Sequence, residues 1–191
     1  MKLLCARQMK TYDLAITAVF VALVVTLGYA FIFLPNVEAV TATVFISGFL
    51  LGKKRGSIVG LLGEFIYASL NPYGASMPPL LAAQVASMGL TGLLGGSVGS
   101  RYKEKITLSA VLLLRFALWG ILLTLIYDVA TCAGFFAFAG FSARQMLASL
   151  AVGLPFYAVH LGSNAIIFAS VVPVLLKKAL DRKLLREREY R

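Results

Sequence analysis

Residues 14–34 read LAITAVFVALVVTLGYAFIFL, an apolar run without a single charged side chain. A helix needs about 20 such residues to cross the roughly 30 Å of hydrocarbon in a bilayer. Basic residues precede the run, as in a secretory signal, but the run is longer than the apolar part of a signal and no clear small-residue cleavage site follows it. We therefore interpret residues 14–34 as the first transmembrane helix.

The remainder of the chain has the same character. Apolar residues make up 60% of the sequence and charged residues 14%, with a mean hydropathy of +0.87, whereas soluble domains carry about 25% charged residues. Five further apolar windows follow, at 37–51, 57–70, 80–98, 108–127 and 147–176. The 191 residues are thus expected to form one membrane domain, 1–191, an all-α compact bundle of about six transmembrane helices with a basic tail at about 177–191.

Some parts of the chain fit this pattern less simply. The second and third windows are short for a bilayer crossing, and the sixth is long and contains Pro155 and Pro173. Proline removes a helix hydrogen bond, so a kink or an interfacial stretch is expected there. Residues 128–146 are apolar enough to dip into the bilayer or to cap a site from outside.

The basic residues predict the orientation. Three lie before the first window, three at 53–55, three at 101–105 and seven in the tail, which makes sixteen of the eighteen. Loops rich in Lys and Arg stay in the cytoplasm, so both termini are expected there, with an even number of crossings. Because these residues lie between apolar runs, the net charge of +10 does not predict nucleic-acid binding. The tail is expected to be a solvated helix end or a contact for anionic lipid.

Small residues four positions apart predict close helix packing. Glycines recur at this spacing around the second connection and in the fourth window, at Gly52, Gly56, Gly60, Gly92, Gly95, Gly96 and Gly99, and we expect them to pack internally. Ala18 and Ala22 form an AxxxA pair on a smooth aliphatic face of the first helix. Internal packing also explains that pair, but it is the better candidate for a surface that contacts a partner.

Charged groups at membrane depth are costly and usually face a partner or a cavity. Glu64 and Arg115 each lie about eight residues from a cytoplasmic turn. A buried ion pair between them is one interpretation. In the other, the Arg115 guanidinium holds a carboxylate or a phosphate of a ligand.

Polar and aromatic side chains also gather in the later helices and outer loops. Trp119 and Tyr127 follow Arg115 at helical spacing, and His160 and Asn164 share a helix face. A structural role is the alternative to ligand binding for each of these residues. Tyr127 would then belong to an interfacial aromatic belt, His160 would be a hydrogen-bond donor with an internal partner, and the loop residues would only form turns. The predicted substrate-binding residues are Asn71, Tyr73, Gln84, Arg115, Trp119, Tyr127, His160 and Asn164.

Motifs for energy conversion and enzyme chemistry are missing from the sequence. It has no GxxxxGK[ST] phosphate loop, no HExxH and no CxxC. Ser163 follows His160, but nothing orients the two residues as a catalytic triad would. We therefore expect no enzyme activity, no cofactor, no metal site and, because Cys5 and Cys132 are predicted on opposite sides of the membrane, no disulfide.

Residues 34–56, LPNVEAVTATVFISGFLLGKKRG, are followed by a glycine-rich span, the LNPYG loop and GLTGLLGG. With AxxxA in the first helix and no nucleotide site, this layout resembles the substrate-binding (S) components of energy-coupling factor (ECF) vitamin importers along nearly the whole chain.

The resemblance implies a cell-membrane protein that captures a vitamin or vitamin precursor outside the cell and docks on a shared transmembrane coupling subunit and two ATPases. It also implies that Ala18 and Ala22 belong to the docking surface and that the ligand lies near the outer side. Two alternatives are a stand-alone secondary transporter, for which we see no inverted repeat, and a structural membrane partner without a ligand.

Overall fold

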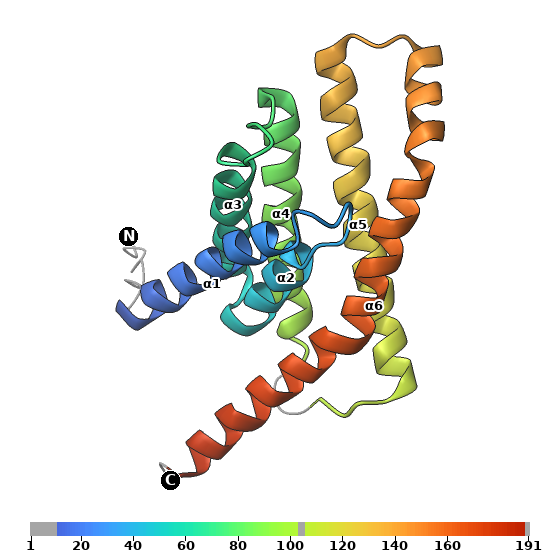
Figure 1. Ribbon diagram of the computed structural model, residues 1–191. Helices are drawn as coiled ribbons and strands as arrows, with labels where there is room; N and C mark the ends of the chain where they lie inside the picture. Colours follow the sequence, from blue (N-terminus) through green and yellow to red (C-terminus); the bar gives the residue numbers. More distant parts are fainter. Residues whose placement is uncertain (1–10, 103–105, 190–191) are drawn as a thin grey trace, which may run out of the picture.

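All regular structure in the described part of the chain is helical. The computed structural model describes residues 11–102 and 106–189, with side chains described as far as residue 182. The elements are α1 (Thr11–Ala30), α2 (Val40–Leu51), α3 (Lys53–Ser69), α4 (Pro78–Gly99), α5 (Ala110–Ala139) and α6 (Ala143–Glu189) (Figure 1). Four of them, α1, α4, α5 and α6, are long and apolar enough to cross a membrane, and α2 is a shorter apolar helix. The all-α prediction is confirmed.

Local sequence explains where several helices begin and end. The Ser109 side chain accepts a hydrogen bond of 3.2 Å from the backbone N–H of Leu112 and so caps the start of α5. Gly140 ends the same helix in the left-handed conformation, at φ 64°, which glycine adopts without the steric cost of a Cβ. Gly52, at φ 89°, joins α2 to α3 as the single residue between them.

Glycines bring α2, α3 and α4 into backbone contact, as the sequence predicted. A Cβ on Gly92 would collide with the carbonyl oxygen of Gly56, and a Cβ on Gly48 would collide with the carbonyl oxygen of Gly92. Gly60 faces the backbone of Met88 in the same way. Gly52 differs, because a Cβ there would meet no atom within 4 Å. Its role is the turn, whereas the other four glycines are needed for helix packing.

Helix α1 packs on α3 by one face only. Val24 lies against Gly63 and Tyr67 lies over Gly28, while an ion pair of 2.6 Å joins Asp13 to Arg55 at the start of both helices. The opposite face of α1 remains exposed.

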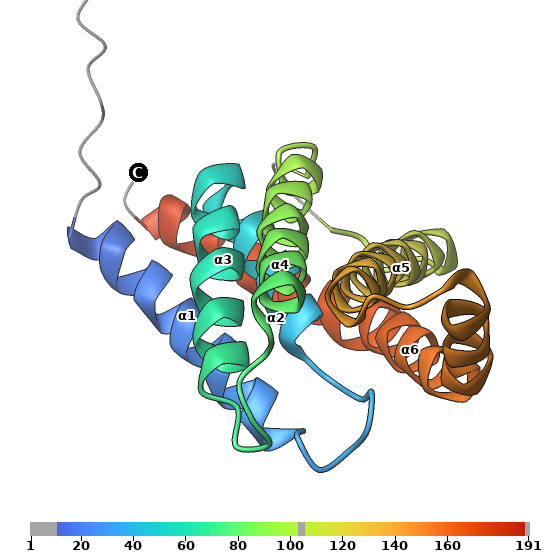
Figure 2. The ribbon, with the colours of Figure 1, turned by 90° about the horizontal axis from the view of Figure 1, so that it is seen from above.

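Aromatic side chains hold α5 and α6 against the rest of the bundle. Phe45 on α2 is fully buried and contacts Phe116 on α5 and Phe168 on α6 edge-on, with ring centroids 6.1 and 5.3 Å apart. Seen from above, α5 and the first part of α6 form a pair beside α1, α3 and α4, and the last part of α6 runs behind α3 and α4 toward the start of α1 (Figure 2). The aromatic core therefore lies between these two groups of helices.

The structure corrects the ends of the last two predicted helices. Residues 128–139 continue α5 instead of leaving it, so the uncertain segment 128–146 becomes the end of α5, a short turn and the start of α6. Asp128 lies inside α5, and its Oδ1 is 2.8 Å from His160 Nδ1 on α6. Helix α6 has 47 residues, includes Pro155 and Pro173, and changes direction along its length (Figure 1). The predicted kink is consistent with this course.

Candidate functional site

A buried histidine lies between two carboxylates from different parts of the chain. His160 on α6 has its Nδ1 2.8 Å from Asp128 Oδ1 on α5 and its Nε2 3.7 Å from Glu38 Oε1, in the segment before α2. Only 7% of His160 is exposed. A protonated imidazole can donate to both carboxylates, and a neutral one to a single carboxylate.

Glu38 connects this histidine to the next turn of α6. Asn164 is fully buried, and its Nδ2 donates to Glu38 Oε1 over 2.8 Å. The other oxygen of Glu38 accepts from the backbone N–H of Thr41 at 2.9 Å. Glu38 is not among the predicted substrate-binding residues. It nevertheless contacts two of them, His160 and Asn164, a link between distant segments that no local pattern reveals.

A second buried carboxyl group lies on α3. Glu64 is 1% exposed, and its Oε1 accepts a hydrogen bond of 3.1 Å from the Tyr127 hydroxyl on α5. The Tyr127 ring stands edge-on to His160, with centroids 6.1 Å apart, and the Gln84 side chain lies beside Tyr127. Glu64 and Gln84 thereby join the same cluster as His160.

The ion pair predicted between Glu64 and Arg115 is not among the salt bridges of the described residues, and Tyr127 is the partner of Glu64 instead. Tyr127 follows Arg115 by twelve residues on one helix, which corresponds to about 18 Å along its axis. Counting residues from each loop suggested equal depths, but α5 starts well below the start of α3 (Figure 1). The equal counts therefore did not indicate a contact.

Two cavities, called the His160 cavities below, border this cluster. One, of about 200 Å³, is lined by Glu38, Glu64 and Tyr67 among others. The other, of about 300 Å³, is lined by Asp128, Cys132 and several aromatic side chains. Both share Asn36, Tyr127 and His160, so they lie on two sides of the same residues.

Several buried oxygens around these cavities have no hydrogen-bond partner among the described residues. They are Glu64 Oε2, Gln84 Oε1, Asp128 Oδ2, Asn164 Oδ1, and the hydroxyl oxygens of Thr41 and Thr124. Buried polar atoms are usually paired, and an unpaired one is costly. Glu64 and Asp128 line the cavities, so their unpaired oxygens can accept hydrogen bonds there, whereas the other four residues line neither cavity.

Cys132 and Tyr157 form a further polar contact at the second cavity. The Cys132 sulfur lies 2.9 Å from the Tyr157 hydroxyl, between α5 and α6. The predicted absence of a disulfide with Cys5 stays a prediction, because Cys5 lies outside the described residues. Within the described residues, no group of three or more His, Cys, Asp or Glu side chains has a geometry that could hold a metal ion.

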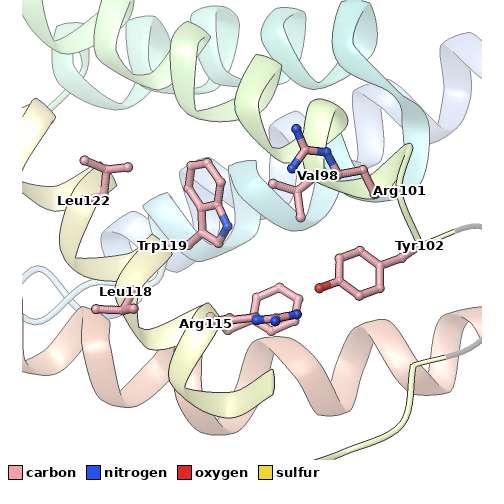
Figure 3. A pocket seen from close by; sticks show the side chains of 8 residues that line it. Val98, Arg101, Tyr102, Arg115, Leu118, Trp119 and Leu122 are labelled. Carbon is pink, nitrogen blue, oxygen red and sulfur yellow. The ribbon is translucent and has the colours of Figure 1, made fainter. Parts of the chain in front are cut away.

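Arg115 and Trp119 line a different cavity, called the Arg115 cavity below. It measures about 600 Å³. Arg101 and Tyr102, just beyond α4, reach toward Arg115 and Trp119 on α5 (Figure 3). The structure thus brings Arg115 and Trp119 together but separates them from His160. Tyr127, which contacts His160, lies eight residues beyond Trp119 on α5, or about 12 Å along the helix.

The two predicted loop residues take positions outside these cavities. Tyr73 is 71% exposed, and Asn71 Oδ1 accepts a hydrogen bond from the Tyr73 backbone N–H at 2.9 Å. Neither residue lines one of the three cavities. Their ligand contact stays a prediction, and their observed role is to shape the turn between α3 and α4.

The predicted docking pair lies on the free side of α1. Ala18 and Ala22 are both exposed, whereas Thr17, Val24 and Gly28 are buried toward the bundle. The pair is thus available for contact with lipid or with another membrane protein.

Comparison with known proteins identifies the family. A family model described as "ECF-type riboflavin transporter, S component" matches residues 8–181. No curated protein and no solved structure gives a match. The family is one of transporter components and not of enzymes. Because the match covers nearly the whole chain, the resemblance to ECF S components is confirmed, and the chain belongs to the family of ECF-type riboflavin transporter S components.

Proposed function

We propose that this membrane-embedded S subunit captures a vitamin or vitamin precursor from outside the cell in the His160 cavities, and hands it on after docking on a coupling subunit. One observation carries the assignment of the site. The His160 cavities are bordered by a buried polar cluster drawn from α3, α5, α6 and the segment before α2, and that cluster keeps unpaired acceptor oxygens. Buried polar groups at membrane depth mark substrate sites more often than structural ones.

The direction of opening follows from the distribution of positive charge. The segment 31–39, which contributes Asn36 and Glu38 to the cavities, contains no Lys or Arg, whereas the connection at 53–55 contains three basic residues. Under the positive-inside rule the first segment lies outside and the second in the cytoplasm. Six crossings with both termini in the cytoplasm are part of this proposal.

The chain has no nucleotide-binding motif, so we infer that energy is supplied by partners. Docking of the exposed Ala18 and Ala22 face on a transmembrane coupling subunit with two ATPases fits the family match. Ligand-dependent transport then requires that the loaded and empty forms bind the coupling subunit with different affinities.

Uptake measurements test the proposal. Cells that express this chain together with an ECF module should accumulate the ligand, and cells that express the chain with a Walker-A lysine variant of both ATPases should not. Uptake that persists without functional ATPases would contradict the proposal and favour a stand-alone secondary transporter.

The two cavities offer a test of where the ligand binds. Trp119→Ala changes the Arg115 cavity and should leave ligand affinity within about threefold of the parent protein, since the His160 cluster remains complete. Isothermal titration in detergent measures both proteins. A loss of affinity of tenfold or more in Trp119→Ala would place the ligand in the Arg115 cavity, as the sequence-based assignment of Arg115 and Trp119 predicts.

A further inference from the structure

Two arginines from different elements line the Arg115 cavity. Arg101, just beyond α4, extends toward α5, and Arg115 extends from α5 toward Tyr102 (Figure 3). No Asp or Glu among the described residues lines this cavity. The salt bridges of the described residues include Arg55 with Asp13 but neither arginine of the cavity. Two guanidinium groups that share a cavity without a carboxylate favour an anion as its occupant.

The adjoining sequence also has an excess of positive charge. Residues 101–105 read RYKEK, with three basic side chains and one acidic one. Glu104 lies outside the described residues, but one carboxylate can neutralise only one cation. Positive charge therefore remains for a bound anion, whichever basic side chain Glu104 meets.

The Arg115 cavity borders an apolar, exposed surface of α5. Leu118 and Leu122 line the cavity and are exposed, and Leu114, one turn before Leu118, is exposed as well. Since α5 is long and apolar enough to cross a membrane, these leucines are positioned to contact acyl chains. A lipid with its headgroup in the cavity could use this apolar surface, whereas a free phosphate could not.

Arg115 also lies near one end of α5. It follows Ala110, the first residue of the helix, by five residues, or about 7.5 Å along the axis. Arginine near a helix end extends its guanidinium toward the membrane interface. Trp119 and Tyr102 line the same cavity, and both residue types are enriched at the interface. Basic pockets between helices at this depth bind the headgroups of anionic lipids.

We propose that the Arg115 cavity binds the phosphate group of an anionic phospholipid, of which phosphatidylglycerol is the simplest example, with the acyl chains along the exposed leucines of α5. The lipid belongs to the leaflet next to Arg101, which is the cytoplasmic leaflet in the orientation proposed above. The site is separate from the His160 cavities, so this inference does not depend on the transported molecule.

Fluorescence tests the proposal directly, because Trp119 is the single tryptophan of the chain and lines the cavity. The full chain is reconstituted in phosphatidylcholine vesicles with increasing fractions of a lipid whose acyl chains carry bromine, which quenches tryptophan on contact. Each basic residue near an anionic lipid contributes about fivefold. Brominated phosphatidylglycerol should therefore quench Trp119 at a mole fraction at least about tenfold lower than brominated phosphatidylcholine does. Equal quenching by the two lipids overturns the inference.

Soluble phosphates distinguish a lipid from a free anion. Inorganic phosphate and glycerol 3-phosphate are introduced on both sides of the vesicles at constant ionic strength, because salt screens charge interactions. Neither compound should reduce quenching by brominated phosphatidylglycerol, since neither has acyl chains to place on the leucines. Displacement of the lipid by either compound overturns the assignment to a phospholipid.

Neutralisation of the two arginines tests the site itself. Arg101→Gln with Arg115→Gln should abolish the preference for brominated phosphatidylglycerol, while Trp119 remains as the reporter. Lys53→Gln with Lys54→Gln is the matched control, because it removes the same charge from exposed residues that line none of the three cavities. The control should keep the preference. An unchanged preference in the arginine variant, or an equal loss in the control, overturns the inference.

A lysine variant replaces the glutamine variant if that protein does not fold. Arg101→Lys with Arg115→Lys keeps both charges but loses the paired donors with which guanidinium binds phosphate. The preference for brominated phosphatidylglycerol should then fall by about threefold or more. An unchanged preference in this variant overturns the assignment to the two arginines.

Discussion

His160 connects three parts of the chain through its two ring nitrogens. Its contacts to Asp128 and Glu38 join α6 to α5 and to the segment before α2, and Asn164 repeats the link to Glu38 one turn further along. Hydrogen bonds that involve charged groups contribute about 1.5–3 kcal/mol each. The cluster therefore fixes the relative positions of the walls of the His160 cavities as well as offering groups to a ligand.

Removal of the imidazole should impair ligand binding. His160→Ala leaves Asp128 and Glu38 facing each other without a donor between them, and we expect ligand affinity to fall by about 10- to 100-fold, which corresponds to about 1.4–2.7 kcal/mol. Titration of the purified variant measures the loss. Ser170→Ala is the control on the same helix, since the Ser170 hydroxyl bonds only to its own helix, at Ile166 O. Unchanged affinity in His160→Ala would contradict the assignment.

The contacts within this cluster could be predicted from the sequence only in part. His160 and Asn164 could be predicted as neighbours because a spacing of four places them on one helix face. The hydrogen bond between Glu64 and Tyr127 could not be predicted, because it depends on how far α3 and α5 are displaced along their axes. Helix packing determines that displacement. Glu38 was not among the predicted binding residues, since its contacts to α6 join residues 122 and 126 positions apart.

At the scale of single helices, close packing of α2, α3 and α4 depends on the absence of side chains at a few positions. The backbones of Gly48, Gly56 and Gly92 approach too closely to admit a Cβ. In lipid, such packing replaces the hydrophobic effect as the source of helix association. The glycine spacing was visible in the sequence because the close contact repeats with the helical period.

Substitution at one of these glycines should destabilise the bundle. Gly92→Ala places a methyl group against the Gly56 carbonyl, so helices must separate, at a cost of about 1–3 kcal/mol. We expect a lower Tm in detergent. Gly162→Ala is the matched control, because a Cβ at Gly162 meets no atom within 4 Å and alanine favours a helix. Equal Tm values for the two variants would contradict the packing described here.

Helix α1 has one buried and one free face, and in the proposed function this division separates ligand binding from partner docking. Ala18→Trp with Ala22→Trp adds bulk only on the exposed side. The double variant should keep its ligand affinity, yet lose co-purification with the coupling subunit and at least about 90% of uptake, a tenfold effect.

Tryptophan on another exposed surface controls for bulk alone. Ala86→Trp changes an exposed position on α4 and should retain both association and uptake. If the Ala18 and Ala22 double variant also retains them, α1 does not provide the docking surface.

For the whole molecule, the described residues form a helical bundle in which the His160 cavities lie beyond the end of α1 and the basic connection at 53–55 lies near its start. Four helices are long and apolar enough to cross a membrane, while α2 has 12 residues and α3 has 17. Composition predicted the helical class because, inside a bilayer, every backbone N–H and C=O group must form its hydrogen bond within the protein. It could not predict that α5 continues to Ala139, because the composition of residues 128–146 also fits a segment that dips into the bilayer or caps a site.

Cysteine labelling in whole cells tests the proposed orientation. In a chain with Cys5→Ser and Cys132→Ser, Ala75→Cys places a thiol on the exposed turn between α3 and α4, and Ser100→Cys places one on the exposed end of α4. A membrane-impermeant maleimide should label the first variant only. Labelling of the second variant and not the first would reverse the orientation.

Native mass spectrometry of the purified chain tests most directly whether the His160 cavities hold the ligand. We predict that the parent protein and Trp119→Ala each retain one small molecule, and that Asn164→Leu, which keeps the branching of the side chain but removes the amide bound to Glu38, retains none. A bound molecule in Asn164→Leu at the same occupancy as in the parent protein, together with its loss from Trp119→Ala, would contradict this account.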